Sequence, residues 1–481
     1  MIGNLKPYLS VKDSGVPWLG EVPAHWEVTR IKRVAQINPS KSEAESTLAV
    51  NADVTFLPME RVGADGRIDV CEVRPVAGVW NGFTYFRRRD VLVAKITPCF
   101  ENGKGACLEQ LPTSIGFGST EFIVLRAHSN LMPQFLYRIT TVSAFRALGA
   151  DAMTGAAGQQ RVPTDFVSNY LAAIPPRSEQ AAIVRVLDHA DRQIRRYIRA
   201  KQKLIKLLEE QKQAILHHAV TRGLDPNVRL KPSGVEWLGA VPAHWEVRRN
   251  GRLFAQRNQT GFRELPILEV SLKTGVRVRD LENKMRKQVM SDPDKYKRAE
   301  KGDIAYNMMR MWQGAVGVAP IDGLVSPAYV VAQPRDGVDV RYFSNLFRTS
   351  VFMGEVDNCS RGIVKDRNRL YWEDFKQISS PYPPLNEQTQ IANAIDESTR
   401  NSNDARGRIE REIDLLREYR TRRIADVVTG KLDVRAAAAA LPDEVDEPET
   451  MDEMQPLDEA DAVQAEEKSD SELDYTEANV D

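Results

Sequence analysis

Two long stretches of the chain place apolar residues at alternating spacings of three and four, which predicts two long amphipathic helices. In the first stretch, eight of the eleven positions taken in such steps from Ile183 to His218 are apolar. The second stripe has a polar middle and consists of Ile391, Ile395, Ile409, Ile413, Leu416, Ile424 and Val427. A single helix would leave its stripe in water, so we expect the two helices to bury each other's stripes as an antiparallel coiled coil.

The segments that precede each helix have a different pattern. Short apolar runs at residues 90–96, 121–125 and 328–332 are separated by turns rich in Gly, Asn and Pro. Runs of this length, bounded by turn residues, are typical of short strands. The sequence therefore predicts α+β globular domains, and it does not specify their strand topology.

The whole arrangement occurs twice. Residues 14–28 read SGVPWLGEVPAHWEV and residues 233–247 read SGVEWLGAVPAHWEV, so thirteen of fifteen positions are identical. The helix starts repeat as PPRSEQAAI and PPLNEQTQI, and the helix ends repeat as TRGLD and TGKLD. A period above 200 residues is too long for a solenoid and indicates a duplicated domain pair. The predicted boundaries are 1–176 and 226–384 for the globular domains, 177–225 and 385–434 for the helices, and 435–481 for a tail.

Antiparallel helices would give the duplication a further meaning. Two direct repeats then become related by a pseudo-two-fold axis, which is the symmetry of duplex DNA with two half-sites. Because the globular parts differ in sequence, the two half-sites should differ as well. The expected target is bipartite, asymmetric and gapped, with the helices acting as a spacer.

Charge is strongly segregated along the chain. Residues 436–481 hold 17 Asp and Glu and one lysine, whereas residues 1–435 hold 65 Lys and Arg against 50 Asp and Glu. A basic body favours a polyanionic partner such as nucleic acid. The acidic tail has the composition of a disordered segment. Two interpretations of it stay open, a solvating tail and an internal mimic of DNA that competes for the basic body.

Composition also bounds the cellular context. No apolar run reaches the roughly 18 residues of a membrane span, and the N-terminus lacks the apolar core of a signal peptide. The four cysteines show no C-x-x-C spacing, which is typical of reduced thiols and not of a metal site. We therefore expect a cytoplasmic protein with no membrane partner and no metal.

The repeated motifs resemble those of specificity subunits of type I restriction–modification enzymes. The resemblance rests on SGVxWLGxVPxHW, PPxxEQxxI, TGKLDV and GDIAYNMMRMWQGAVG (residues 302–317), and it covers about residues 14–434. It implies two target-recognition domains that bind double-stranded DNA and two spacer helices that dock two methyltransferase subunits. Those subunits would methylate adenine N6 with S-adenosylmethionine, and two motor-nuclease restriction subunits would use ATP and magnesium. The acidic tail departs from the family pattern.

The resemblance implies a chain that is not itself an enzyme and binds no cofactor. No phosphate-loop motif and no NPP-aromatic motif of adenine methyltransferases occurs in the sequence. Base flipping and methyl transfer would then belong to a partner. The alternatives are a protein-binding scaffold and a self-contained DNA-reading enzyme of another defence system.

Candidate DNA-binding side chains lie in glycine-rich loops, because loops on a rigid scaffold are preferred binding sites. Each globular domain offers two such loops, at residues 95–104 and 155–161 and at residues 307–314 and 360–367. The candidates are Lys95, Asn102, Lys104, Gln159, Gln160, Arg161, Asn307, Arg310, Gln313, Ser360, Arg361, Lys365 and Arg367. The alternative is that these glycines only form turns and the cations are solvated. His25 and His244 of the repeated signature have no nucleophile or base nearby in sequence, so we expect a structural role for them.

Overall fold

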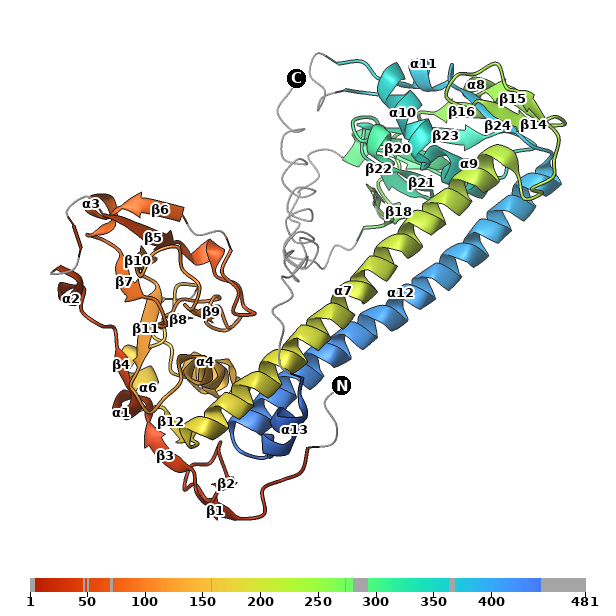
Figure 1. The fold of residues 1–481 in the computed structure, drawn as a ribbon. Coiled ribbons are helices and arrows are strands. Elements are labelled where there is room, and N and C mark those ends of the chain that lie inside the picture. The colour runs from red at the N-terminus through yellow and green to blue at the C-terminus, as the bar shows by residue number, and fades with distance from the viewer. Residues whose placement is uncertain are drawn as a thin grey trace. The chain divides into compact units, whose positions relative to one another are not determined.

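The computed structural model describes most of the chain (Figure 1). The described residues are 5–45, 48–49, 52–69, 72–156, 158–272, 274–279, 293–362 and 368–442. They divide into two compact units, one from residues up to 200 and from 411 onward, the other from residues 201–410. Each unit thus contains one globular part and a section of each long helix. Within the described part of the chain, no helix is long and apolar enough to span a membrane.

The two predicted helices are α7 (Arg177–Arg222) and α12 (Leu385–Val428). In the first unit the beginning of α7 lies beside the end of α12, and Arg420 Nε donates to Asp191 Oδ1 at 2.9 Å. In the second unit the end of α7 lies beside the beginning of α12, where a Cβ added to Gly223 would lie 3.2 Å from Glu387 Oε1. The helices are therefore antiparallel, as predicted (Figure 1). The pseudo-two-fold relation of the domains stays a prediction.

Six of the seven positions in the predicted stripe of α12 are buried and Leu416 is half-buried, whereas the predicted stripe of α7 is only partly correct. Ile183, Leu187 and Ile194 are buried as expected. Tyr197 and Leu204, however, are 50% and 45% exposed. A strict spacing of 3.5 residues drifts around a straight helix of 3.6 residues per turn, so the true stripe moves one position along the chain. The buried residue is then Ile198, 3% exposed, in place of Tyr197.

The first unit contains two four-stranded sheets. One is antiparallel throughout, in the order β4 (Ala35–Ile37), β11 (Phe122–Ala127), β8 (Val91–Ala94), β9 (Gly105–Cys107). The other has the order β6 (Glu72–Pro75), β5 (Asp53–Leu57), β10 (Ile115–Gly118), β7 (Thr84–Arg87), with β10 and β5 parallel. Two-stranded pairs join β1 (Val11–Asp13) to β2 (Glu21–Pro23) and β3 (Glu27–Arg30) to β12 (Leu171–Ile174).

The second unit repeats the first of these sheets in the same order. Its strands are β16 (Phe254–Arg257), β23 (Tyr329–Pro334), β20 (Ile304–Asn307) and β21 (Val316–Val318). Two-stranded pairs join β13 (Leu230–Pro232) to β14 (Ala240–Pro242), β15 (Glu246–Arg249) to β24 (Ser379–Tyr382), β17 (Leu268–Ser271) to β18 (Gly275–Val278) and β19 (Lys297–Ala299) to β22 (Gly323–Val325). The shared sheet is thus the duplicated scaffold, and the strands outside it differ between the two domains.

Short helices pack around these sheets. In the first unit they are α1 (Ile31–Val34), α2 (Ser42–Glu45), η1 (Met59–Arg61), α3 (Val76–Val79), α4 (Pro133–Thr141), α5 (Ser143–Asp151) and α6 (Thr164–Asn169). In the second unit they are α8 (Asn250–Leu253), η2 (Pro293–Lys295), η3 (Met311–Gln313), α9 (Val340–Phe347), α10 (Ser350–Cys359) and α11 (Trp372–Phe375). Both predicted α+β domains are therefore observed.

The long helices belong to the cores of the globular parts. Ile183 of α7 and Val427 of α12 share one hydrophobic cluster with Trp26 and Phe135 of the first unit. In the second unit, Ile391 of α12 packs in the corresponding cluster with residues of the globular part. Fully burying such side chains contributes about 1.5–3 kcal/mol each. Each domain is therefore fixed to its helix section by apolar packing.

The predicted tail begins with ordered structure. Residues 435–440 form α13 (Arg435–Ala440), and Ala438 is 6% exposed within the first core. The start of the predicted tail at residue 435 is therefore too early, because these alanines favour a helix and one of them packs. Residues 443–481, which hold the 17 acidic side chains, lie outside the described residues.

Candidate functional site

The repeated signature connects each globular part to a helix start. His25 Nε2 lies 2.8 Å from Glu179 Oε2, and Trp26 Nε1 donates to Glu179 Oε1 at 3.2 Å. In the second unit, His244 Nε2 lies 2.8 Å from Glu387 Oε2 in the same way. Each helix start contains a Glu-Gln pair, the EQ pair, at residues 179–180 and 387–388. The glutamate of this pair accepts a hydrogen bond from the histidine of the repeated signature, which explains one of the two repeated residues. Each histidine therefore links the repeated signature to the start of a long helix, which agrees with a structural role.

The glutamine of each EQ pair binds the loop that precedes a short helix. Gln180 Oε1 accepts from Met132 N at 2.7 Å, just before α4. Gln388 Oε1 accepts from Asp339 N at 2.8 Å, just before α9. Both glutamines are fully buried, so each side chain satisfies backbone groups that water cannot reach. These contacts explain why both the glutamate and the glutamine of the motif are repeated.

The two candidate loops of the first domain lie side by side. Val162 N donates to Lys95 O at 2.8 Å, and Thr97 N donates to Gln160 O at 2.9 Å. The loops at residues 95–104 and 155–161 are 60 positions apart in sequence, and only the fold brings them together. The two loops are therefore neighbours in the first unit.

In the second domain an equivalent bond joins the first loop to the segment that follows the second loop. Leu370 N donates to Met308 O at 2.9 Å. Leu370 follows Val162 by 208 positions, which is the offset of the helix starts. The strand before each first loop is also fixed alike, since Lys95 N donates to Glu121 O and Met308 N donates to Ala328 O. The two domains present the same loop scaffold with different side chains.

The candidate side chains of the first domain are at or near the surface. Asn102, Gln159 and Arg161 are exposed, whereas Lys95, Lys104 and Gln160 are half-buried. Arg161 Nη2 forms an ion pair with Glu121 Oε1 at 2.9 Å. The hydrogen bond from Arg161, opposed by partial burial, holds the pKa of the Glu121 carboxyl below its usual value. All six residues are therefore at least partly accessible in this unit.

The candidates of the second domain are less uniform. Gln313 and Arg361 are exposed and Arg310 is half-buried. Asn307 is only 8% exposed, and its Oδ1 accepts from Met309 N at 2.9 Å. Asn307 therefore shapes the turn and is poorly placed to reach a base.

The four candidates of the loop at residues 360–367 have separate outcomes. Ser360 Oγ donates to Val356 O at 2.6 Å and thereby ends α10. Arg361 forms an ion pair with Asp374. Lys365 and Arg367 lie outside the described residues.

Two arginines near the loops were missed by the sequence interpretation. Arg369 is exposed and occupies the position of Arg161, because Arg369 pairs with Arg361 as Arg161 pairs with Thr154. Its offset of 208 from Arg161 was visible in the sequence. Arg146 lies under the first loop, where a Cβ added to Gly103 would be 2.6 Å from the Arg146 Cζ. No sequence pattern connected residue 146 with that loop.

Buried ion pairs fix the strand that leads into the first loop of each domain. Arg126 Nε and Nη2 donate to the two oxygens of Asp90 at 2.7 Å each. Arg257 Nε donates to Asp303 Oδ2 at 2.7 Å. Asp90 and Asp303 are equivalent, but Arg126 lies on β11 and Arg257 lies on β16, which corresponds to β4. The two repeats thus satisfy the same carboxylate from different neighbouring strands.

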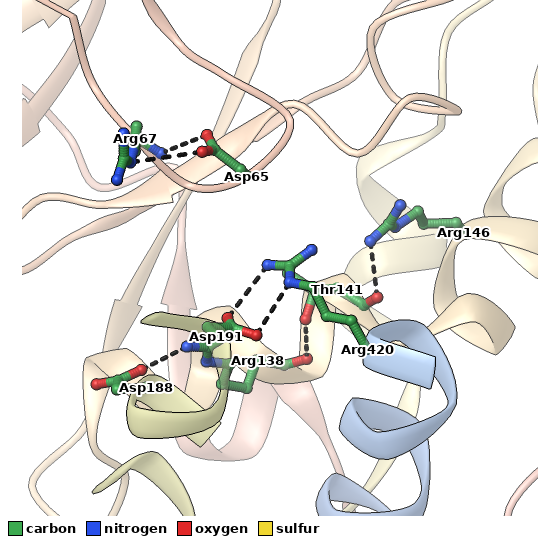
Figure 2. Close-up of polar contacts among 8 residues, drawn as sticks. All are labelled: Asp65, Arg67, Arg138, Thr141, Arg146, Asp188, Asp191 and Arg420. Carbon is green, nitrogen blue, oxygen red and sulfur yellow. Dashed lines mark hydrogen bonds and ion pairs between the residues drawn. The ribbon is translucent and has the colours of Figure 1, made fainter. Parts of the chain in front are cut away.

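A third buried cluster ties the first domain to both helices (Figure 2). Asp191 of α7 accepts from Arg138 of α4 at 2.7 Å and from Arg420 of α12 at 2.9 Å. Burial would raise the pKa of the Asp191 carboxyl, but the two arginine charges lower it on balance. Figure 2 also shows Arg146, whose Nη2 donates to Thr141 O at 2.8 Å. Three elements of the first unit are therefore locked by one carboxylate.

A duplicated α+β domain on two antiparallel helices, with a matched loop pair in each copy, defines a two-domain scaffold. The chain is 35% identical over 186 residues to the EcoEI type I restriction enzyme specificity subunit of Escherichia coli, and 34% identical over 186 residues to the EcoAI subunit. Each match covers 38% of this chain and 30% of the relative. A relative from Methanocaldococcus jannaschii, provisionally named as the MjaX specificity subunit, is 23% identical over 78% of this chain and 87% of its own length.

Solved structures share the same fold. The HsdS subunit of Thermoanaerobacter tengcongensis matches with a TM-score of 0.52 at 17% identity, over 85% of this chain and 98% of that one. A chain from a study of complex assembly in a type I restriction–modification system matches with a TM-score of 0.64 at 18% identity, over 85% and 99%. No protein-family model matches the sequence. The chain is thus similar in part of its sequence to specificity subunits of type I restriction enzymes, and it shares the fold of the HsdS subunit.

Proposed function

We propose that the chain is the DNA-recognition subunit of a type I restriction–modification complex, in which each globular domain reads one half of a bipartite, gapped target. The observation that carries this proposal is the matched loop pair. Val162 N to Lys95 O and Leu370 N to Met308 O are the same backbone bond in the two domains. The side chains around these bonds differ, as expected where one scaffold reads two sequences.

Charge supports a polyanionic target. The body up to residue 435 carries 65 Lys and Arg against 50 Asp and Glu. Cations of this kind contact phosphates and fix the register of a protein on duplex DNA, whereas side chains such as Arg310 and Gln313 reach base edges. The similarity to specificity subunits of type I restriction enzymes favours DNA over other polyanions.

The helices offer surface for partner subunits. Several large apolar side chains of α7 and α12 are 38–63% exposed, and such residues mark protein contacts when they cluster. They are Tyr197, Leu204, Leu207, Ile215, Leu415 and Tyr419. In the proposed complex, two methyltransferase subunits dock on the helices and bind S-adenosylmethionine, and two restriction subunits use ATP and magnesium. The chain itself is non-catalytic, binds no cofactor and works in the cytoplasm.

The direct test is to map methylated adenines by long-read sequencing in a host that expresses the chain with its methyltransferase. The motif should consist of two different halves with a fixed gap. An insertion of four residues after Leu208 in α7 should widen the gap and leave both halves unchanged. Exchange of residues 307–314 for another loop should alter one half only. A contiguous motif, or a gap that ignores the insertion, would contradict the proposal.

A binding assay separates the alternative functions. Sequence-specific readers of DNA lose affinity steeply as salt rises, because each phosphate contact releases a counterion. The full chain should therefore bind duplex DNA with a strong salt dependence. A protein-binding scaffold would bind no DNA, and a self-contained enzyme would modify or cut DNA without partner subunits.

A further inference from the structure

The beginning of α7 carries a stripe of arginines in the first unit. Arg185, Arg192, Arg195, Arg196 and Arg199, named here the arginine stripe, lie at spacings of seven, three, one and three. At 3.6 residues per turn these positions fall within an arc of roughly 100° on one side of the helix. From residue 192 to residue 206 the helix contains no Asp or Glu. The stripe is therefore a concentrated positive face.

Two carboxylates that precede or lie within this part of α7 form ion pairs with arginines outside the stripe. Asp188 and Asp191, on the same helix, pair with Arg138, and Asp191 also pairs with Arg420. Among the described residues, the Nε atoms of Arg195 and Arg199 and the Nη1 atom of Arg199 are buried with no hydrogen-bond acceptor. Guanidinium nitrogens in this state favour an additional anion, because leaving them unpaired costs free energy.

The chain leaves the described structure at the first arginine of this stripe. Arg185 Nη2 donates to both Leu441 O and Pro442 O at 2.9 Å. The next seven residues, 443–449, read DEVDEPE and contain five carboxylates, and residues 443–481 contain 17 carboxylates and one lysine. From Arg185 to Arg199 the helix rises about 21 Å, and seven residues of chain reach at most about 25 Å. The first acidic residues are thus long enough to cover the stripe.

We propose that the acidic segment 443–481 binds the arginine stripe of its own chain. Two observations point to this segment over an external ligand, namely its attachment point at Arg185 and its opposite charge. A tethered segment also has an effective concentration in the millimolar range, which favours it over a free anion. If the proposed DNA-recognition function is correct, the segment also competes with DNA phosphates for these arginines.

The test uses a fluorescent peptide of residues 443–481 and two full-length chains. One chain is native, and the other has the 17 tail carboxylates replaced by their amides. Fluorescence anisotropy at low salt should show that the peptide binds the neutral-tail chain at least about tenfold more tightly than the native chain, because the native stripe is already occupied. Equal affinity for the two chains, or no binding to the neutral-tail chain, would overturn the proposal.

Matched variants locate the site. In the neutral-tail chain, Arg192→Gln, Arg195→Gln and Arg199→Gln together should weaken peptide binding about tenfold, since each ion pair with a flexible peptide contributes modestly. The control removes three exposed cations elsewhere, with Lys12→Gln, Lys32→Gln and Arg422→Gln. A lysine triple at 192, 195 and 199 keeps the charge and should keep most of the binding. Equal losses in the arginine triple and the control would refute docking on the stripe.

A DNA competition separates this inference from the proposed function. Duplex DNA should displace the peptide from the neutral-tail chain, and it should bind that chain more tightly than the native one. If the duplex binds neither chain, the proposed function fails, and the peptide titration still decides whether the acidic segment docks. If DNA binds and does not displace the peptide, the stripe is not shared and the competition is refuted.

Discussion

Replacement of Asp191 by asparagine should destabilise the first unit far more than an equivalent change in the second. Asp191 is 2% exposed and accepts from Arg138 and Arg420, which lie on different elements. The variant Asp191→Asn keeps the shape of the side chain and removes its charge. Two guanidinium groups then lose their shared counterion, and the side chain of Arg138 is only 9% exposed.

The expected cost follows from that burial. Removing one partner of a buried ion pair typically costs about 3–5 kcal/mol, because the remaining charge stays desolvated. The side chain of Arg420 is 24% exposed and Arg138 keeps its ion pair with Asp188, so the lower end of that range applies. We therefore expect a loss of about 3 kcal/mol. For a unit of this size, that corresponds to a fall in melting temperature of roughly 6–12 °C.

Asp396→Asn provides the matched control. Asp396 follows Asp188 by 208 positions and also lies on a long helix, but its side chain is 51% exposed where it pairs with Arg341 at 3.2 Å. An exposed pair contributes about 1 kcal/mol or less. Differential scanning calorimetry of the full chains, with hydrogen exchange to assign the early transition to α4 and α7, measures both variants. A loss below about 1 kcal/mol for Asp191→Asn, or equal losses for the two variants, would refute the assigned role of the buried carboxylate.

Three further predictions follow from other contacts. The pKa of Asp191 is lowered in the folded chain, so the stabilisation by this carboxylate is present above its unfolded pKa near 4 and is lost as pH falls through its folded pKa. Urea unfolding measures the difference in stability between the native chain and Asp191→Asn. That difference should be constant from about pH 5 to 8 and should shrink in acid. Gly430 has φ 75°, and a Cβ added there would lie 2.4 Å from Pro23 Cδ. Gly223 has φ 80°, and the atom nearest to a Cβ added there would be Glu387 Oε1 at 3.2 Å. Gly430→Ala should therefore lower the melting temperature more than Gly223→Ala. Arg310→Ala should cost about 1–3 kcal/mol of DNA-binding free energy and relax the specificity at one base position. Arg369→Ala should weaken binding to all DNA sequences alike and reduce the slope of the salt dependence by about one. A series of binding measurements over single-base variants of the target distinguishes the two patterns.

Local patterns in the sequence were sufficient for the helices and for the duplication. The apolar positions predicted for α12 are buried at both ends of the helix, and only Leu416 is half-buried. The register of α7 failed after Ile194, where the seam was extended at 3.5 residues per turn although the helix does not keep that period. Tyr197 is exposed and Ile198 is buried as a result. The period of an apolar pattern therefore predicts a helix more securely than it predicts its buried face.

The candidate site was only partly predictable, since its parts are distant in sequence. Comparison of the repeats located both loops of each domain, and the fold then joined them through Val162 and Leu370. Side-chain placement could not be predicted in the same way. Asn307 ends a buried strand and shapes a turn, and Arg146 reaches the first loop from α5. Whether a polar residue of a loop points outward depends on packing partners that no local pattern contains.

The repeated signature differs from the loops because it has to fit both repeats at once. Trp26 belongs to the first repeat and binds Glu179 of that repeat, yet it also packs near Gly430, which ends the helix of the second repeat. Trp245 of the second repeat lies in the same way near Gly223, which ends the helix of the first. Because the helices are antiparallel, each joint combines the start of one repeat's helix with the end of the other's. A change in either helix end must therefore fit a tryptophan from the opposite repeat, which explains why these positions match while the loops that face solvent do not.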